Sequence, residues 1–510
     1  MGCAECKLRA NHSKTTVSPG RLVDVSSLPQ SVSSILEPCA FVLKHSGPAA
    51  IPVLPGAMPG AETLLRNGSV EVQSLLRTRG AFLDRIAALR GAGLQSHIAL
   101  SLMVLRTAGD CTFVARACGL PAGDAQSLDD LLESRLPSLL GHGPLPQTSH
   151  QCRQAMGTAA TSKIFVPTAS GGLGFQSQVL SADAAHCASW HETLPKIVAR
   201  LNVESVAVLE THSPWVRGAV QRGNALARVA LSDHTLNIGD PELVASQKIL
   251  AHASSSAAAD AWVAALAGDC RASASWLSAG GSGSSGWLLP PTLPTWRMTD
   301  PQHRYALRYR LGLASFQEGS RCCHRRKDGT LCGVVMDTVG THARTCAVGG
   351  WRIKKHNAVA AALASWAEDH CGCEVHKEIT LPSAADDHFE SRLDLVIVSP
   401  QLAGPAFVDV VICSACSVDA LQRGSGIAPG TAARIAEAKK TCKYPNIQAW
   451  GFGVEDHGRW GASALALARA LAPSEPDERS SAMRTLFQSV STALQKTAAE
   501  AMITAGASAS

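Results

Sequence analysis

The feature that most constrains the fold is a group of cysteines and one histidine between residues 321 and 346. Structural zinc sites use four cysteine or histidine ligands at short local spacings, arranged as a tetrahedron. The first expected ligand is Cys323, and Cys322 or His324 could take its place. We predict a zinc knuckle in which zinc is purely structural, because protein ligands fill all four positions. The expected ligands are Cys323, Cys332, His342 and Cys346.

Composition sets broad limits. The chain has 510 residues and is 46% hydrophobic, which is enough for roughly three domains with real cores. Its net charge of +5 is too small to establish a polyanionic partner by itself. The 17 cysteines and a start without an apolar signal segment indicate a reducing compartment, where cysteines are thiols or metal ligands. The longest apolar run, near residues 98–105, is too short to span a membrane.

Basic residues lie on both sides of the cysteine and histidine group. Such runs often form a solvated surface, but here they lie between a metal-ligand cluster and an acidic region. Cations that neutralise phosphates supply most non-specific affinity for nucleic acids. We therefore expect these side chains to contact DNA. The predicted nucleic-acid-binding residues are Arg325, Arg326, Lys327, Arg352, Lys354, Lys355 and His356.

Three acidic residues follow in strand-like segments. Glu378 lies in an alternating segment, Asp394 begins an apolar run, and Asp409 lies inside another. A carboxylate in an apolar strand is costly to bury unless it is paired or binds a cation. A hairpin would bring Asp394 and Asp409 to one end of a sheet, and Glu378 could complete an oxygen site for Mg²⁺. The alternative is that the aspartates cap strands or pair with Arg392 or Arg434.

A predicted helix after these strands carries Lys439, Lys440 and Lys443. A metal ion at the acidic residues can activate water and stabilise the leaving oxygen of a phosphodiester. A lysine nearby can hold the scissile phosphate or lower the pKa of the attacking water. The residues leave open which lysine has this role. The catalytic group that we predict contains Asp394, Asp409, Glu378, Lys439, Lys440 and Lys443.

The first half of the chain is predicted to be helical. From about residue 62 to residue 140, apolar side chains recur at three- and four-residue intervals, with breaks at Gly93, Gly109 and Pro121. Such periodicity predicts a bundle of amphipathic helices. It does not indicate what the bundle binds.

The pattern changes in the middle of the chain. Residues 164–167 predict a strand, and a glycine turn at 171–174 precedes a helix over about 181–190. Residues 201–270 are again mainly helical. The glycine- and serine-rich run at 280–286 is typical of a flexible linker. We therefore place a domain boundary ahead of Trp296.

The order of features in the second half resembles the restriction-like endonuclease end of site-specific non-LTR retrotransposons. This family belongs to the PD-(D/E)xK nucleases. The resemblance implies a mixed sheet flanked by helices, Mg²⁺ bound by Asp394 and Asp409, assistance from Glu378, and one catalytic lysine. The motifs that carry it are the knuckle, Lys355-His356-Asn357, Arg392-Leu393-Asp394, Asp409-Val410, and Lys439/Lys440 before Lys443-Tyr444.

Two positions depart from the family pattern. Leu393 replaces the usual proline, which only stiffens a turn. Val411 stands where the third motif often has its lysine. Activity would therefore depend on a lysine that has migrated to the following helix.

Weaker motifs extend the resemblance to the first half. Residues 8–15 resemble the late palm of a reverse transcriptase, and residues 51–56 resemble the turn before its thumb. The helices near 95–106 resemble the thumb itself, and residues 171–174 resemble the turn between thumb and linker. The polymerase aspartates are absent, because neither Asp-Asp pair follows an aromatic residue in a hairpin context. The resemblance thus implies the carboxyl-terminal part of a retroelement polyprotein, without reverse transcriptase activity in this chain alone.

Together these expectations describe an α+β multidomain protein with a helical thumb and linker region, a zinc knuckle and an α/β restriction-endonuclease-like core. The function implied is Mg²⁺-dependent nicking of target DNA in the nucleus to prime reverse transcription. Element RNA and a reverse transcriptase palm would be partners in the full-length parent, and no membrane partner is expected. The alternative is a zinc-dependent nucleic-acid-binding module whose nuclease has decayed. The expected domains are 1–60 (residual palm), 61–200 (helical thumb), 201–295 (helical linker with a hinge), 296–356 (basic segment with the knuckle) and 357–510 (endonuclease).

Overall fold

The computed structural model describes six stretches of the chain and divides it into two compact units. Unit 1 is drawn from Met1–Arg85, Val104–Ser134 and Gln176–Ala258, and unit 2 from Ile86–Met103, Arg135–Phe175 and Ala259–Ser510. The predicted palm motif at residues 8–15 lies outside the described residues. These are 42–44, 50–52, 61–140, 158–231, 246–381 and 391–507, except for 108, 110, 203, 213, 267, 445 and 446.

The first half of the chain is helical, as the periodicity predicts. Its helices begin and end close to the predicted breaks at Gly93, Gly109 and Pro121. The strands β1 (Val42–Lys44) and β2 (Ala50–Pro52) form a short antiparallel pair. The helices are α2 (Ala61–Gly91), α3 (Ser96–Thr107), α4 (Thr112–Cys118), α5 (Ala122–Leu140), α7 (Thr158–Phe165), α8 (Gln178–Leu201), α9 (Val206–His212), α10 (Pro214–Leu231) and α11 (Gln247–Ala265).

The core of unit 1 contains small and aliphatic side chains such as Val72, Ala115 and Leu128. Asp129 shows how the unit is tied together. Its buried carboxylate accepts hydrogen bonds from the Ser177 hydroxyl (2.6 Å) and from the backbone N–H of Gln178 (2.8 Å) at the start of α8. Backbone N–H groups at the start of a helix lack partners within the helix. This aspartate therefore has a structural role.

Unit 2 contains a four-stranded mixed sheet with the strand order β3-β4-β5-β6. The strands are β3 (Glu374–Leu381), β4 (Ser391–Val398), β5 (Ala406–Cys413) and β6 (Ala449–Glu455). β3, β4 and β5 are antiparallel neighbours, whereas β5 and β6 are parallel. Parallel strands need a crossover connection, and here it contains α16 (Val418–Gln422) and α17 (Thr431–Lys443).

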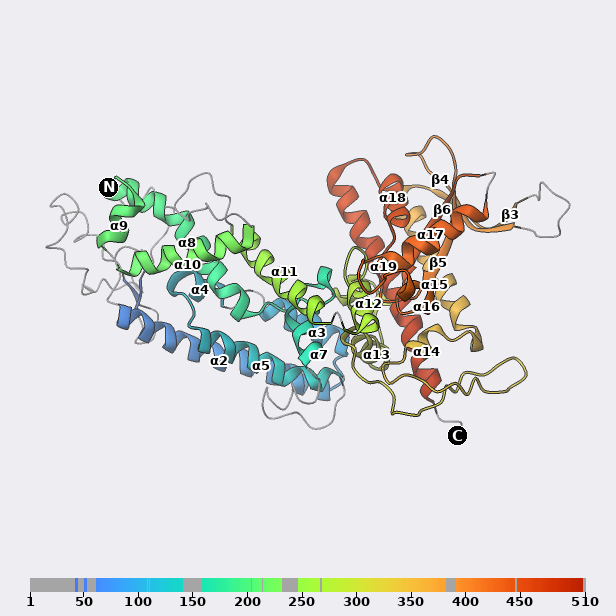
Figure 1. Ribbon diagram of the computed structural model, residues 1–510, viewed down its shortest axis with the longest axis horizontal. Helices are drawn as coiled ribbons and strands as arrows, with labels where there is room; N and C mark the ends of the chain where they lie inside the picture. Colours follow the sequence, from blue (N-terminus) through green and yellow to red (C-terminus); the bar gives the residue numbers. More distant parts are fainter. Residues whose placement is uncertain are drawn as a thin grey trace. The chain divides into compact units, whose positions relative to one another are not determined.

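Helices complete the core around this sheet (Figure 1). α15 (Trp351–Cys371) packs against β3, β4 and β5 and along α19 (Pro476–Gly506), and α18 (Ala462–Leu471) packs against β6. Residues of α15 that the sequence places on one face, Val359, Leu363 and Trp366, are all buried. They share a core with side chains of the strands and of α18 and α19.

The remaining helices of unit 2 are short. They are η3 (Thr168–Ser170), α12 (Cys270–Ala279), η4 (Gly286–Leu288), η5 (Pro294–Trp296), α13 (Asp300–Leu311), α14 (Thr341–Thr345) and η6 (Val348–Gly350). The strand predicted at 164–167 is wrong, because Ile164 and Phe165 end α7. Local preference for a strand is overridden there by tertiary packing.

The glycine- and serine-rich run at 280–286 is a packed segment of unit 2, not a flexible linker. The N–H of Gly281 donates to the carbonyl of Ala169 (2.6 Å), and Ser284 and the adjacent Trp287 are buried. A Cβ at Gly286 would lie 2.4 Å from the carbonyl oxygen of Phe487. Glycine is needed here for close approach of two backbones. The domain boundary predicted ahead of Trp296 consequently falls inside unit 2.

Among the described helices, none combines the length and the apolar character that a membrane crossing requires.

Candidate functional site

The chain between α13 and α14 folds back on itself as a narrow hairpin. Arg321 bridges Val335, and Arg325 bridges Leu331, both in antiparallel fashion. The backbone N–H of Cys322 donates to the carbonyl of Val334 (2.9 Å). This pairing carries two cysteines toward the start of α14.

Asp337 fixes the third ligand residue. Its carboxylate accepts hydrogen bonds from the backbone N–H groups of Gly340 and Thr341 (2.8 Å each) and of His342 (2.9 Å), and so starts α14. Burial raises the pKa of Asp337, but these three N–H groups outweigh it and the pKa is lowered. The aspartate therefore stays charged and holds the backbone of His342 in place at the start of α14.

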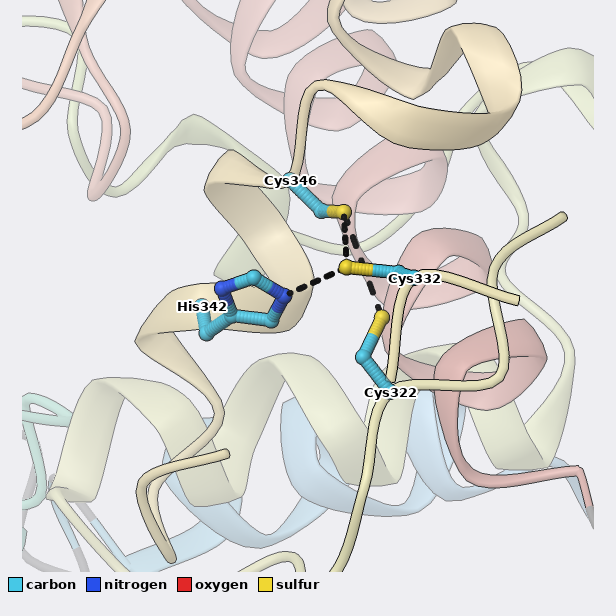
Figure 2. Close-up of side chains that lie close together, drawn as sticks. All are labelled: Cys322, Cys332, His342 and Cys346. Carbon is cyan, nitrogen blue, oxygen red and sulfur yellow. Dashed lines mark hydrogen bonds between the residues drawn. The ribbon is translucent and has the colours of Figure 1, made fainter. Parts of the chain in front are cut away.

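Four side chains meet at this point, as Figure 2 shows. The Sγ atom of Cys346 lies 3.9 Å from that of Cys322 and 3.6 Å from that of Cys332, and the Sγ of Cys332 lies 3.5 Å from Nε2 of His342. All four ligand atoms lie within 4.8 Å of one another. Zinc–sulfur bonds of about 2.3 Å place tetrahedral sulfurs about 3.8 Å apart. The group therefore has the ligands and spacing of a structural zinc site.

The first member of the group that could bind metal is Cys322, not the predicted Cys323. The Sγ of Cys323 lies 3.5 Å from the carbonyl oxygen of Arg321, outside the group. His324, the other alternative, contacts the carbonyl of Ala501 through Nε2 (2.8 Å). Successive side chains of an extended chain point to opposite faces. Cys322 and Cys323 therefore cannot both face the ligand group.

The pKa values of the four side chains shift in different directions. Burial raises the pKa of Cys332, but hydrogen bonds to its thiolate, first that from the N–H of Val334, outweigh it and the pKa is lowered. Burial lowers the pKa of His342, so the ring is neutral as a metal ligand must be. Burial raises the pKa of Cys322 and that of Cys346. Binding of a metal ion would therefore have to displace protons from these two thiols.

The ligand group belongs to the core of unit 2. Cys322 and Cys346 pack with Tyr309 of α13 and with Met502 and Ala505 of α19. The adjacent residue Arg344 is fully buried, and its guanidinium donates to the carbonyl of Asp456 and to Gln495 of α19. The knuckle thus packs against α13 and α19.

Asp394 and Asp409 lie close together on neighbouring strands, and their side chains interact. The ladder between β4 and β5 ends with Leu395 opposite Val408, and the two aspartates are the next residues beyond that pair. Oδ2 of Asp394 accepts a hydrogen bond from the N–H of Val410 (2.6 Å) and lies 3.0 Å from Nε2 of His356. Burial raises the pKa of Asp394, but the hydrogen bonds and the charge of His356 outweigh it and the pKa is lowered.

Asp409 is buried, with only 2% of its side chain exposed, and both of its oxygens have partners. Oδ1 lies 2.5 Å from Nζ of Lys440, and Oδ2 accepts from the Tyr444 hydroxyl (2.7 Å) and lies 3.4 Å from Nζ of Lys443. A buried charge is stable only when it is paired and hydrogen-bonded. Burial and the negative charge of Asp409 both raise the pKa of Tyr444.

Glu437 sets the orientation of α17. Its buried carboxylate accepts hydrogen bonds from the N–H groups of Gly453 (3.3 Å) and Ala464 (3.0 Å). Lys440 follows three residues later on the same face and meets Asp409. Lys439 points elsewhere, and its ammonium lies 3.1 Å from Asp419. The structure therefore brings two of the three predicted lysines to the aspartates.

Glu378 does not join them. The register of β3 and β4 would place it opposite Asp394, but this pair is missing from the ladder and Glu378 has φ 55°. Its exposed carboxylate lies 3.5 Å from Arg392. Among the described residues, only the cysteine and histidine group gathers three or more metal-binding side chains. The predicted cage of three carboxylates is thus not formed.

The predicted nucleic-acid-binding residues separate into two sets. Lys355 is buried, and its ammonium donates to the carbonyl of Arg344; burial lowers its pKa to about 8. His356 contacts Asp394 instead of facing solvent fully. The other five side chains are exposed: Arg325, Arg326, Lys327, Arg352 and Lys354.

A pocket of about 910 Å³ in unit 2 joins the two sites. His342 lines one part of it, and Asp394, Glu378 and Lys440 line another. The sequence did not point to Arg271, Val335 or Val418 as members of this pocket, because none of them was among the predicted metal-binding, catalytic or nucleic-acid-binding residues. A site with paired carboxylates and lysines beside a basic surface is chemically suited to phosphate esters. No protein-family model matches the sequence, and no curated protein shows significant similarity to it.

Proposed function

We propose that this chain is a Mg²⁺-dependent DNA endonuclease that nicks one strand of its target. The observation that carries the proposal is the pair of neighbouring carboxylates, Asp394 and Asp409, with Lys440 against Asp409 and a pocket lined by Asp394 and Lys440. The mixed sheet with helices on it supports the proposal, because the resemblance described above implies that arrangement.

The two aspartates fit Mg²⁺ by their donor chemistry. This ion is usually bound through one or two carboxylates, while substrate phosphate and water complete its octahedron. One or two carboxylates suffice, so the separate position of Glu378 is no obstacle, but the ion would have to replace one of the donors that now contact Asp409. When bound, the ion would polarise the phosphoryl group and lower the pKa of a water molecule.

The protein residues would divide the remaining work. Lys443 and Tyr444 hold the Asp409 carboxylate, and His356 holds that of Asp394. Lys440, which contacts Asp409 and lines the pocket, would bind a non-bridging oxygen of the scissile phosphate. Water adds to phosphorus, the bond from phosphorus to the 3′ oxygen breaks, and that oxygen takes up a proton. The products are a 5′-phosphate and a 3′-hydroxyl.

The 3′-hydroxyl is the group that a reverse transcriptase can extend, so the product suits the role that the resemblance implies. In this proposal zinc has a structural role, and Arg325, Arg326 and Lys327 on the hairpin contact DNA phosphates. The chain would act in the nucleus, together with element RNA and a palm domain that it does not contain itself.

A nicking assay on supercoiled DNA tests the proposal. The protein with both Asp394→Asn and Asp409→Asn should lose Mg²⁺-dependent nicking. The matched control is Asp419→Asn, because Asp419 is exposed, lies on α16 and contacts Lys439 only at the surface. Equal nicking by the wild type and the double variant would exclude the acidic site.

A second candidate is a nucleic-acid-binding module without cleavage. It is favoured by the three donors that already occupy Asp409 and by Val411, which stands where the family often has lysine. In that case, binding to DNA would weaken steeply with salt. No nicking would then occur with Mg²⁺ or Mn²⁺.

A further inference from the structure

Three exposed aliphatic side chains line the pocket beside Asp394. They are Val335 (52% exposed), Ile353 (66%) and Val418 (66%). They come from three separate elements: the hairpin, the first turn of α15 and the start of α16. Single exposed aliphatic residues are ordinary, but apolar residues gathered at one site mark binding surfaces. This pocket therefore has apolar surface that a ligand can cover.

The same pocket is lined by exposed cations, namely Arg271, Arg352 and Arg392. All four acidic residues that line the pocket already have partners. Asp337 accepts three backbone hydrogen bonds, and Asp456 is buried and accepts from Tyr309 (3.0 Å). Asp394 contacts His356, and Glu378 lies 3.5 Å from Arg392 at the surface; the proposed nuclease assigns Asp394 to the metal. A ligand that fits must combine negative charge with an apolar face.

A nucleotide in DNA offers both negative charge and an accessible apolar face only when its base is no longer stacked on the neighbouring bases. Paired DNA offers phosphates outside and hides the faces of its bases, so it would leave the aliphatic side chains uncovered. Proteins that kink DNA insert aliphatic side chains between bases, and enzymes that extrude a nucleotide hold its base in a pocket. Pockets that enclose small ligands have volumes of about 300–1,000 Å³. The pocket thus has room for one nucleotide.

We propose that the pocket holds an unstacked nucleotide next to the scissile phosphate, with Ile353 against its base and the arginines against its phosphates. The substrate class is therefore DNA with a locally unpaired nucleotide, in preference to uniform duplex. This inference rests on the proposed nuclease function. Ile353 has the central place because it precedes His356 by one helical turn, and His356 contacts Asp394.

The first experiment compares nicking of a matched duplex with nicking of the same duplex that carries a two-nucleotide bulge. The wild type should nick at the bulge at least about tenfold faster, because stacking of one base accounts for roughly that factor. Ile353→Ser should lose this preference, and Ile353→Thr should reduce it less. The matched control is Ile427→Ser, since Ile427 is 84% exposed and does not line the pocket.

The second experiment does not require cleavage. A duplex with 2-aminopurine in the bulge is bound in EDTA, and fluorescence reports how far the base is unstacked. An increase with the wild type and with Ile427→Ser, but not with Ile353→Ser, supports the pocket even when no variant nicks DNA. The inference is overturned if Ile353→Ser and Ile427→Ser behave alike, or if matched duplex is nicked as fast as the bulge. Absence of nicking on every substrate would instead count against the nuclease.

Discussion

Adjacent lysines on α17 face different carboxylates. Lys440 contacts the buried Asp409, whereas Lys439 contacts the exposed Asp419. Successive residues of a helix are separated by about 100°, so only one of the two can face the sheet. Lys440 follows Glu437 by three residues and therefore lies on the same face of α17, so Lys440 is the lysine that faces the sheet.

Replacement of these lysines tests their assignment. Lys440→Ala should lower the rate of nicking by about 10²–10³, as expected when a charge that stabilises the transition state is removed. Lys439→Ala is the matched control, because it removes the same type of side chain at the neighbouring position. It should leave the rate within about twofold of the wild type. Rates would be measured on supercoiled DNA under single-turnover conditions. Equal losses in the two variants would contradict the assignment.

At the scale of elements, the hairpin between α13 and α14 decides which cysteine binds metal. It presents Cys322 to the core and Cys323 to the other face. We predict that Cys322→Ala binds zinc at least roughly a hundredfold more weakly, because even partners of ligands contribute tenfold or more. Cys323→Ala should retain stoichiometric zinc. Metal content after dialysis, measured on both variants, separates Cys322 from Cys323 as the ligand.

The packed run at 280–286 gives a second prediction at this scale. Gly286→Ala places a methyl group 2.4 Å from the carbonyl of Phe487, and overpacking of this kind costs about 1–3 kcal/mol. A flexible linker would show no loss. Gly404→Ala is the control, because its Cβ meets no atom within 4 Å. Urea denaturation of both variants measures the difference in free energy of unfolding.

At the scale of the whole molecule, buried histidines make unit 2 sensitive to acid. Burial lowers the pKa of His97 and that of His303, and His303 is lowered further by the nearby ring of His97. Their rings stack with centroids 4.9 Å apart. Burial also lowers the pKa of His457 to about 3. Below pH 6.5 the unfolded chain therefore binds protons that the folded chain does not, and stability falls as the pH falls.

Each such histidine contributes a slope of up to about 1.4 kcal/mol per pH unit below its unfolded pKa. Between pH 7.5 and pH 5.5, the free energy of unfolding of His303→Gln should therefore fall by about 1.4 kcal/mol less than that of the wild type. His376→Gln, a change at an exposed strand position, should keep the wild-type slope. Urea denaturation at the two pH values provides the measurement, and identical slopes for all three proteins would refute the prediction.

Patterns within one element predicted much of unit 2. Alternation located β3, and β-rich apolar runs located β4 and β5. A hairpin was expected to bring Asp394 and Asp409 to one end of a sheet, and their side chains do interact there, whereas their catalytic role stays a prediction. Features that depend on contacts between distant segments were not predictable. The left-handed backbone of Glu378 and the burial of Lys355 cannot be predicted from the residues next to them in the sequence. The glycine run at 280–286 was misjudged for the same reason.

The last long helix has a consequence for the order of events during synthesis. α19 contributes Leu486 and Val490 to the core under the sheet and Met502 to the core around the metal-binding thiols. Since α19 follows both sites in the chain, the thiols and the aspartates leave the ribosome before either core can close. A nascent chain would therefore carry accessible thiols until α19 docks.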